Sequence, residues 1–282
     1  MGLAGHLWHT MTGMDKISNI VAPPDARTLV LDLFAAHPGG RFATSELVLA
    51  GGLFGLSSTA LRTAVARLRR EGRLVALSRG VHAAGPAADA WRRRVEGWRD
   101  APGHRTEWRG GWLMAAARPS SLSRTAWRAT LRALEVEGFR QTRQGLWLRP
   151  DNLAGGLGAC RDRLIEYGAA PALMTARLDA LDPGAARTVP DLWDPSGLAA
   201  SRRALLAQLN QSLERLHRMP VEAAARESLT LGRSAVRAIV RDPLLPAEWE
   251  EAPLLGELVA AMEPYQDAGR TIWLAYLGRD VG

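Results

Sequence analysis

The chain has 282 residues, a formal net charge of +7 and one cysteine, Cys160, which excludes an intramolecular disulfide and a cysteine-based zinc cluster. It contains no apolar run of about 18 residues, so nothing is expected to span a membrane, and residues 1–24 lack the basic start and apolar core of a signal peptide. We expect a cytoplasmic protein of two or three small domains, with residues 1–24 as a flexible extension.

Two helical patterns follow this extension. Apolar residues recur at helical spacing over residues 29–34, and Asp25 precedes them as the expected N-cap. A second helix is expected to begin at Thr44 and to end at Gly51-Gly52.

A third helix, expected after Ser57 and ended by Gly72, has an apolar stripe and a polar face. The stripe comprises residues at spacings of three and four, namely Leu61, Ala64, Val65 and Leu68. Arginine binds guanine through two hydrogen bonds, and serine and threonine bind bases or phosphates. We therefore predict a recognition helix for double-stranded DNA, with contacts from Ser57, Ser58, Thr59, Arg62, Thr63, Ala66, Arg67 and Arg70.

Residues 73–77 and 81–83 are expected to form a hairpin with Arg79 at its tip, placed to contact DNA. The element order predicts a winged helix-turn-helix domain over residues 25–86. Charge supports this, because residues 25–109 hold 14 basic and 8 acidic residues (+6), whereas residues 110–282 hold 21 and 20 (+1). Such an excess attracts phosphate and makes affinity salt-dependent. The alternative is an ordinary amphipathic helix with a solvated, charged face.

Residues 87–106 are expected to be a linker helix, followed by a second domain over residues 107–182. Strands are expected over 112–117, near 138–148 as a pair, and over 172–178. Helices are expected after Ser123 and over 157–167, with Leu164 and Ile165 facing inward and Cys160 filling the core. The order βαββαβ is typical of a ferredoxin-like sandwich.

Residues 191–268 show helical patterns only. We expect helices over 196–217, 221–241 and 254–262, with a rigid break at residues 242–246. The leucines of this helical domain form either a dimer surface or an internal core, and the sequence leaves both open. The fold class is therefore α+β, with winged helix-turn-helix, ferredoxin-like and helical domains in that order.

Three stretches of the sequence carry a resemblance to a known family: residues 60–72, residues 108–113 followed by 138–150, and residues 241–249. In this order they resemble the PaaX family of repressors of phenylacetate catabolic genes. The resemblance implies a homodimer that represses transcription at palindromic promoter sites. It also implies release by an acyl-CoA thioester, such as phenylacetyl-CoA or a related aromatic acyl-CoA. The chain departs from the family at Arg109, where an acid is usual, and in the hairpin, which lacks the usual tyrosines and has His82.

The second domain also resembles the Cas2 nucleases, which place a metal-binding aspartate at the end of the first strand. Residues 115–119 contain no carboxylate that would hold Mg²⁺, which argues against this alternative. A constitutive DNA-binding structural protein without a ligand stays open.

The six histidines form no metal-ligand pattern, so we predict no metal, no cofactor and no enzymatic activity. If an acyl-CoA binds, its phosphates need guanidinium partners. The candidates are Arg118, Arg128 and Arg149 of the second domain.

Overall fold

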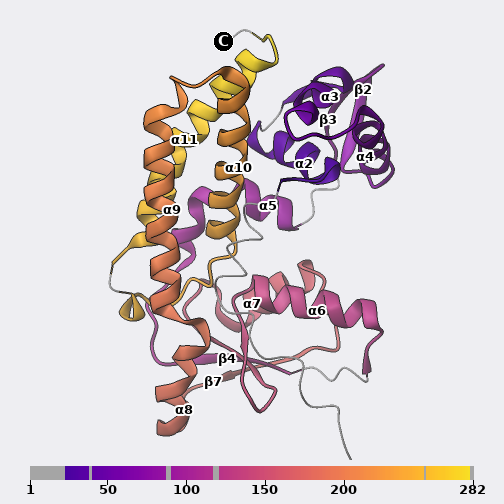
Figure 1. Cartoon of the computed structure of the whole chain (residues 1–282). Coiled ribbons are helices and arrows are strands. Elements are labelled where there is room, and N and C mark those ends of the chain that lie inside the picture. Colours follow the sequence, from indigo (N-terminus) through magenta and orange to yellow (C-terminus); the bar gives the residue numbers. More distant parts are fainter. Residues whose placement is uncertain (1–22, 38–39, 87–89, 117–120, 251, 280–282) are drawn as a thin grey trace, which may run out of the picture.

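The structure, a computed structural model, describes residues 23–37, 40–86, 90–116, 121–250 and 252–279. These residues form a mixed α+β fold with two small antiparallel sheets and long helices toward the C-terminus (Figure 1). Most of the expected extension, residues 1–22, lies outside the described residues. None of the helices in the described part of the chain is long and apolar enough to cross a lipid bilayer.

The N-terminal part consists of three helices and a three-stranded sheet with the order β1-β3-β2. Its elements are α2 (Ala26–Ala36), β1 (Arg41–Ala43), α3 (Thr44–Gly52), α4 (Ser58–Arg70), β2 (Leu74–Ser78) and β3 (Val81–Ala84). The expected caps are confirmed, since Asp25 accepts from the amide of Thr28 at 2.7 Å and Ser57 from that of Ala60 at 3.2 Å. Strand β1 was not expected, and it pairs with β3.

The apolar stripe of α4 packs against α2 and α3. Leu61 and Leu68 are fully buried, and Ala64 and Val65 are nearly so. Gly51 allows the close approach of α3 to α4, because a Cβ there would lie 2.8 Å from Cδ2 of Leu61. The apolar stripe predicted for this helix is therefore confirmed as its buried face.

A four-stranded antiparallel sheet with the order β5-β6-β4-β7 forms the middle part. The elements are α5 (Ala90–Glu96), the 3₁₀ helix η1 (Trp98–His104), β4 (Trp112–Ala116), α6 (Arg124–Val136), β5 (Arg140–Gln141), β6 (Trp147–Pro150), α7 (Gly156–Glu166) and β7 (Met174–Leu178). Helices α6 and α7 cover one face (Figure 1). Cys160 and Leu164 are buried there, but Ile165 is 41% exposed, so the prediction that Ile165 faces inward was wrong. At 100° per residue, only one of these two neighbours can point at the sheet.

Four tryptophans pack on the opposite face of the sheet. Trp108 and Trp112 flank the start of β4, and their rings meet those of Trp193 and Trp249 at centroid distances between 5.2 and 6.4 Å. These four tryptophans therefore join the sheet to the segments that follow it.

The C-terminal part is helical. Its elements are α8 (Pro183–Thr188), η3 (Val189–Trp193), α9 (Pro195–Leu216), α10 (Val221–Val240), η4 (Ala247–Trp249) and α11 (Leu254–Tyr276). Helix α11 is much longer than the expected 254–262. Pro264 lies inside it, and the helix continues because Tyr265 and Trp273 keep its buried face.

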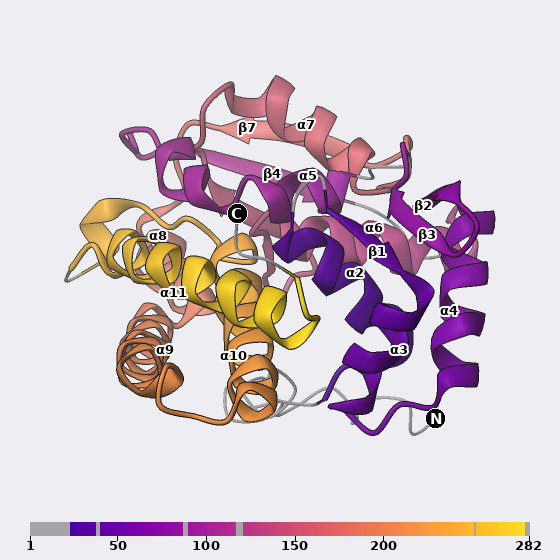
Figure 2. The same cartoon turned by 90° about the horizontal axis from the view of Figure 1, so that it is seen from above.

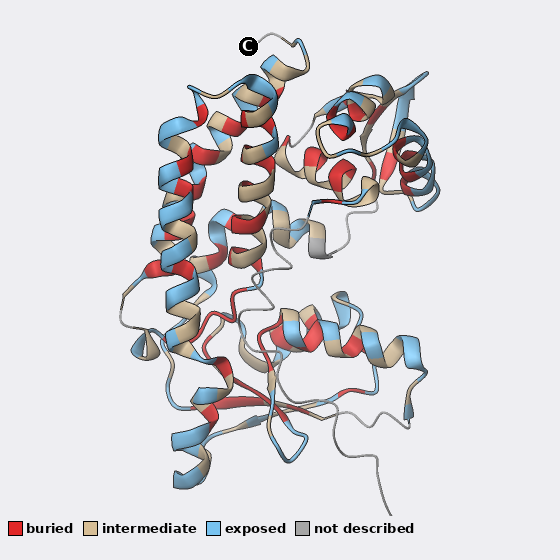
Figure 3. Ribbon diagram, viewed as in Figure 1, coloured by how far each residue is buried: buried red, intermediate tan, exposed pale blue. Residues whose placement is uncertain are grey.

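Helices α9, α10 and α11 lie side by side and share a core (Figures 1 and 2). The buried residues lie on the faces that the helices turn toward one another (Figure 3). Leu209 and Leu216 are among them, which supports the internal-core alternative for these leucines.

A buried ionic cluster ties these helices to the middle part. Arg202 of α9 donates to Asp242 at 2.9 Å and to Glu250 at 2.8 Å. Arg105, just after η1, donates to both carboxylate oxygens of Glu250 at 2.9 and 2.7 Å. The acidic residues after α10 therefore have a structural role in the described chain.

Candidate nucleic-acid interface

The polar face of α4 is open to solvent. Ser57, Ser58, Thr59, Arg62, Thr63, Ala66, Arg67 and Arg70 are all exposed. Opposite them, Leu61, Ala64, Val65 and Leu68 hold the helix against its neighbours, so the exposed side chains project from a rigid support. The hydroxyl oxygen of Ser57 already accepts a hydrogen bond from the amide of Ala60 as the N-cap. Part of its capacity to accept hydrogen bonds is therefore used within the helix.

The guanidinium groups of this surface make no short polar contact within the described chain. Those of Arg62, Arg67, Arg69, Arg70 and Arg79 form no hydrogen bond or ion pair with any described residue, and Arg70 acts on Glu71 only by longer-range attraction. The sole acid in the stretch from Ser57 to Ala83 is Glu71, which follows α4.

Glu71 is directed away from the α4 surface. Both of its carboxylate oxygens contact Arg27 of α2, at 2.8 and 2.7 Å. The hydrogen bond from Arg27 lowers the pKa of Glu71, so this carboxylate stays ionised and committed to α2. The positive charge of α4 is therefore available to an anionic partner.

The hairpin of β2 and β3 lies beside α4, on the outer side of the N-terminal part and away from α10 and α11 (Figures 1 and 2). Arg79 lies in its turn and is exposed. The fold thus places Arg79 and the α4 residues on the same outward side of the molecule.

The three arginines proposed for a ligand do not form one site among the described residues. Arg128 is exposed on α6, and Arg118 lies outside the described residues. Arg149 is 1% exposed, and it donates to the backbone of Pro150 and Glu137 and to Asn152. The prediction for Arg149 therefore conflicts with the structure, because its guanidinium is enclosed and already hydrogen-bonded.

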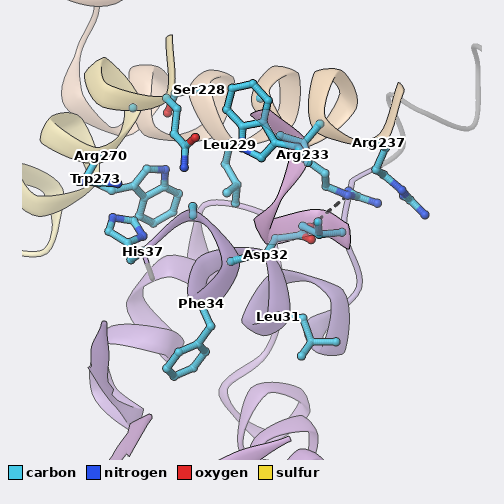
Figure 4. Close-up of a pocket in the computed structure, with 18 of the residues that line it drawn as sticks. Leu31, Asp32, Phe34, His37, Ser228, Leu229, Arg233, Arg237, Arg270 and Trp273 are labelled. Atoms are coloured by element: carbon cyan, nitrogen blue, oxygen red, sulfur yellow. Dashed lines mark ion pairs between the residues drawn. The ribbon is translucent and has the colours of Figure 1, made fainter. Parts of the chain in front are cut away.

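A cavity of about 300 Å³ lies instead between α2 on one side and α10 and α11 on the other (Figure 4). Apolar and aromatic side chains form much of its wall, including Trp98, Tyr265 and Trp273. Five arginines and one carboxylate line it as well, and sequence reasoning did not anticipate this grouping.

The carboxylate is Asp32 of α2, which lies 3.1 Å from Nε of Arg233 on α10. Burial raises the pKa of Asp32 to about 6, and the nearby Arg233 and Arg237 only partly oppose this. Burial also lowers the pKa of His37, at the other end of the cavity (Figure 4). The junction between the N-terminal part and the C-terminal helices is therefore both apolar and charged.

The chain is similar to the uncharacterized protein Rv0674 from Mycobacterium tuberculosis. The two share 25% sequence identity over 89% of this chain and 98% of that chain, with a TM-score of 0.59. No protein-family model matches the chain, and no curated protein matches it either. The similarity covers most of the fold, and it assigns no activity to this chain.

Metal ligands do not gather in the residues described: no three histidine, cysteine, aspartate or glutamate side chains are placed to hold an ion. The cavity residues had a weak sequence signal. Arg233 and Arg237 are four apart on α10, and Asp32 stands among the apolar residues of α2. A charged residue within an otherwise apolar helix face indicates that this face packs against a second element that also carries charged or polar groups.

Proposed function

We propose that the chain is a dimeric, ligand-responsive transcriptional repressor that binds palindromic promoter DNA through α4. The observation that carries this proposal is the exposed face of α4, where guanidinium groups that make no short polar contact within the described chain lie beside hydroxyl groups. The succession of α2, α3, α4 and the β2–β3 hairpin supports a winged helix-turn-helix domain as part of this proposal. Helix α4 is then the recognition helix, and the hairpin is the wing.

The middle part supports the same proposal. Its strand order β5-β6-β4-β7, with α6 and α7 on one face, supports a ferredoxin-like domain as part of this proposal. Together with the helical C-terminal part, this is the arrangement that the PaaX resemblance implies. An acyl-CoA thioester, such as phenylacetyl-CoA, is the inducer class implied by the same resemblance.

In a dimer, each α4 enters a major groove and each wing contacts the flanking backbone. The half-sites are then about one helical turn apart, or a multiple of it. An inducer releases the repressor only if it binds the DNA-free state more tightly than the DNA-bound state.

Fluorescence anisotropy on the promoter DNA next to the gene for this protein tests the proposal, across a salt series and with and without acyl-CoA thioesters. We expect specific binding that a thioester abolishes. Arg62→Ala and Arg67→Ala remove contacts at the α4 face, so each abolishes specific binding and leaves the dimer intact in sedimentation. Arg128→Ala, which removes an exposed arginine of α6, is the matched control and keeps wild-type affinity.

Wild-type affinity for the operator in both α4 variants overturns the assignment of α4. Specific binding that no thioester changes favours the alternative of a constitutive DNA-binding protein. Equal affinity for promoter and random DNA leaves only electrostatic attraction and overturns the repressor proposal.

A further inference from the structure

The cavity between α2 and the C-terminal helices has the size and wall of a small-molecule site. Its volume of about 300 Å³ lies at the lower end for ligand pockets, which are mostly apolar with a few polar groups. Aromatic side chains line it from two elements: Trp98 from η1, and Tyr265 and Trp273 from α11. An apolar body of one or two rings, or a medium-length alkyl chain, fits such a space.

The charges in the wall favour an anion. The five lining arginines are Arg73, Arg92, Arg233, Arg237 and Arg270, and the one lining carboxylate is Asp32. Asp32 is paired with Arg233. By contrast, Arg237 is half-buried, and its guanidinium makes no hydrogen bond or ion pair with the described residues. Arg270 is exposed at the opposite end of the cavity, beside His37 and Trp273 (Figure 4).

Asp32 is the one lining anion that attracts Arg237, and it is already paired with Arg233. Burial lowers its pKa, and the neighbouring cations Arg241 and Arg233 lower it further, against the attraction of Asp32 alone. A half-buried guanidinium next to other cations is stabilised strongly by a carboxylate that enters beside it.

We infer that this cavity binds a small organic carboxylate whose apolar body lies among Trp98, Tyr265 and Trp273 and whose carboxylate meets Arg237. Arg73, Arg92 and Arg233 already have acidic partners within the chain, so the guanidinium of Arg237 matches a monoanion better than a phosphate or a polyanion. The ligand class is therefore an aromatic or medium-chain carboxylic acid.

The position of the cavity also gives the ligand a regulatory role, an inference that rests on the proposed function. Asp32 and Phe34 belong to α2, which packs against α4, whereas Arg233 and Trp273 belong to α10 and α11. A ligand that fills the space changes how α2 is held against α10 and α11. It thereby biases the orientation of α4, since two sites are coupled when a ligand binds two states unequally.

The test uses the full chain in calorimetric titrations with 2-naphthoate, 4-phenylbutyrate and decanoate, each beside its neutral primary alcohol. We expect at least one carboxylate to bind once per chain and to change the tryptophan fluorescence. Arg237→Gln lowers the affinity for that carboxylate about tenfold and changes the affinity for the alcohol less than about twofold. Arg226→Gln, an exposed position of the same helix that does not line the cavity, changes neither affinity.

Ala35→Phe places a ring in the cavity and is expected to abolish binding of both acid and alcohol in a protein with wild-type circular dichroism. The inference is overturned if none of the three acids binds at millimolar concentration. It is also overturned if Arg237→Gln binds the acid like wild type.

Promoter-DNA anisotropy on the same preparations separates the two proposals. Specific DNA binding without carboxylate binding removes the inference and leaves the proposed function. Carboxylate binding without specific DNA binding removes the proposed function and leaves the ligand site.

Discussion

Arg279, which follows α11, donates from Nε to Oε1 of Glu46 on α3 at 2.6 Å and from Nη2 to Oε2 at 2.5 Å. Glu46 also accepts from the amide of Ala43 at 2.6 Å, at the start of α3. The same guanidinium reaches the carbonyl of Arg41 at 2.6 Å, and Tyr276 reaches that of Leu49 at 3.1 Å. These hydrogen bonds attach the C-terminal end of α11 to β1 and α3, which precede α4.

The Arg279–Glu46 pair is expected to stabilise the fold through a bidentate, partly buried contact. A double-mutant cycle of Arg279→Met and Glu46→Gln should give a coupling energy of about 1 kcal/mol in urea unfolding. Burial alone raises the pKa of Glu46, but the bonds from Arg279 and Ala43 bring it below its usual value. A coupling energy near zero would contradict the prediction that this ion pair stabilises the fold.

Asp32 is expected to give a distinctive pH dependence. Its pKa is about 6 in the folded chain against 3.8 for the free group, so the folded state favours the protonated carboxyl. Ionisation then costs stability as pH rises through this window, by about 3 kcal/mol in full. Unfolding free energies measured from about pH 3 to pH 8 should show wild type losing that amount relative to Asp32→Asn. Parallel pH curves for the two proteins contradict it.

Replacing the buried Arg149 should destabilise the fold strongly. Arg149→Met leaves the backbone acceptors of Glu137 and Pro150, and Oδ1 of Asn152, without their donor. We expect a loss of about 3–5 kcal/mol in denaturant unfolding. Arg128→Met, on the exposed side of α6, should stay within about 0.5 kcal/mol of wild type. Similar stabilities for both variants would show that the Arg149 contacts contribute little.

Cys160 should be inert in the folded protein. It is 1% exposed, and its pKa is raised to about 12, mainly by burial and further by Glu137. A disulfide reagent is therefore expected to react only as fast as the chain opens, and within seconds in 6 M guanidinium. Since the chain has one cysteine, a single absorbance trace reports this. Rapid reaction under native conditions refutes the buried placement.

Substitution of Arg79 tests the proposal that the β2–β3 hairpin contacts the DNA backbone as a wing. Arg79→Ala should weaken binding to all duplexes alike and reduce the slope of log affinity against log salt by about 0.9. Arg143→Ala is the matched control, because Arg143 is exposed in the turn between β5 and β6. An unchanged slope for Arg79→Ala means that the hairpin does not contact phosphate.

Local patterns were sufficient to predict α4. Its caps at Ser57 and Gly72 and the spacing of Leu61 to Leu68 act within a few residues, so the sequence predicts both its bounds and its buried face. The continuation of α11 past Pro264 was missed because the local rule for proline opposes it, and the burial of Trp273 decides the outcome.

Other features depend on contacts that no short window contains. Strand β1 has three residues, too few for an alternating pattern, and it forms because β3 pairs with it. The cavity brings Asp32 to Arg233 and Arg237, about two hundred positions later in the chain. Such a grouping follows from how α2 packs against α10, which periodicity does not specify.

The apolar core beneath α2, α3 and α4 is closed by residues from far along the chain. Ala225, Leu229 and Trp273 belong to the same cluster as Leu29, Leu33 and Leu61. Excising residues 25–86, the part that we propose binds DNA, would expose these apolar side chains to water and favour aggregation. A shortened chain that keeps this part therefore has to include α10 and α11, or carry polar side chains on the face of α2 that they cover.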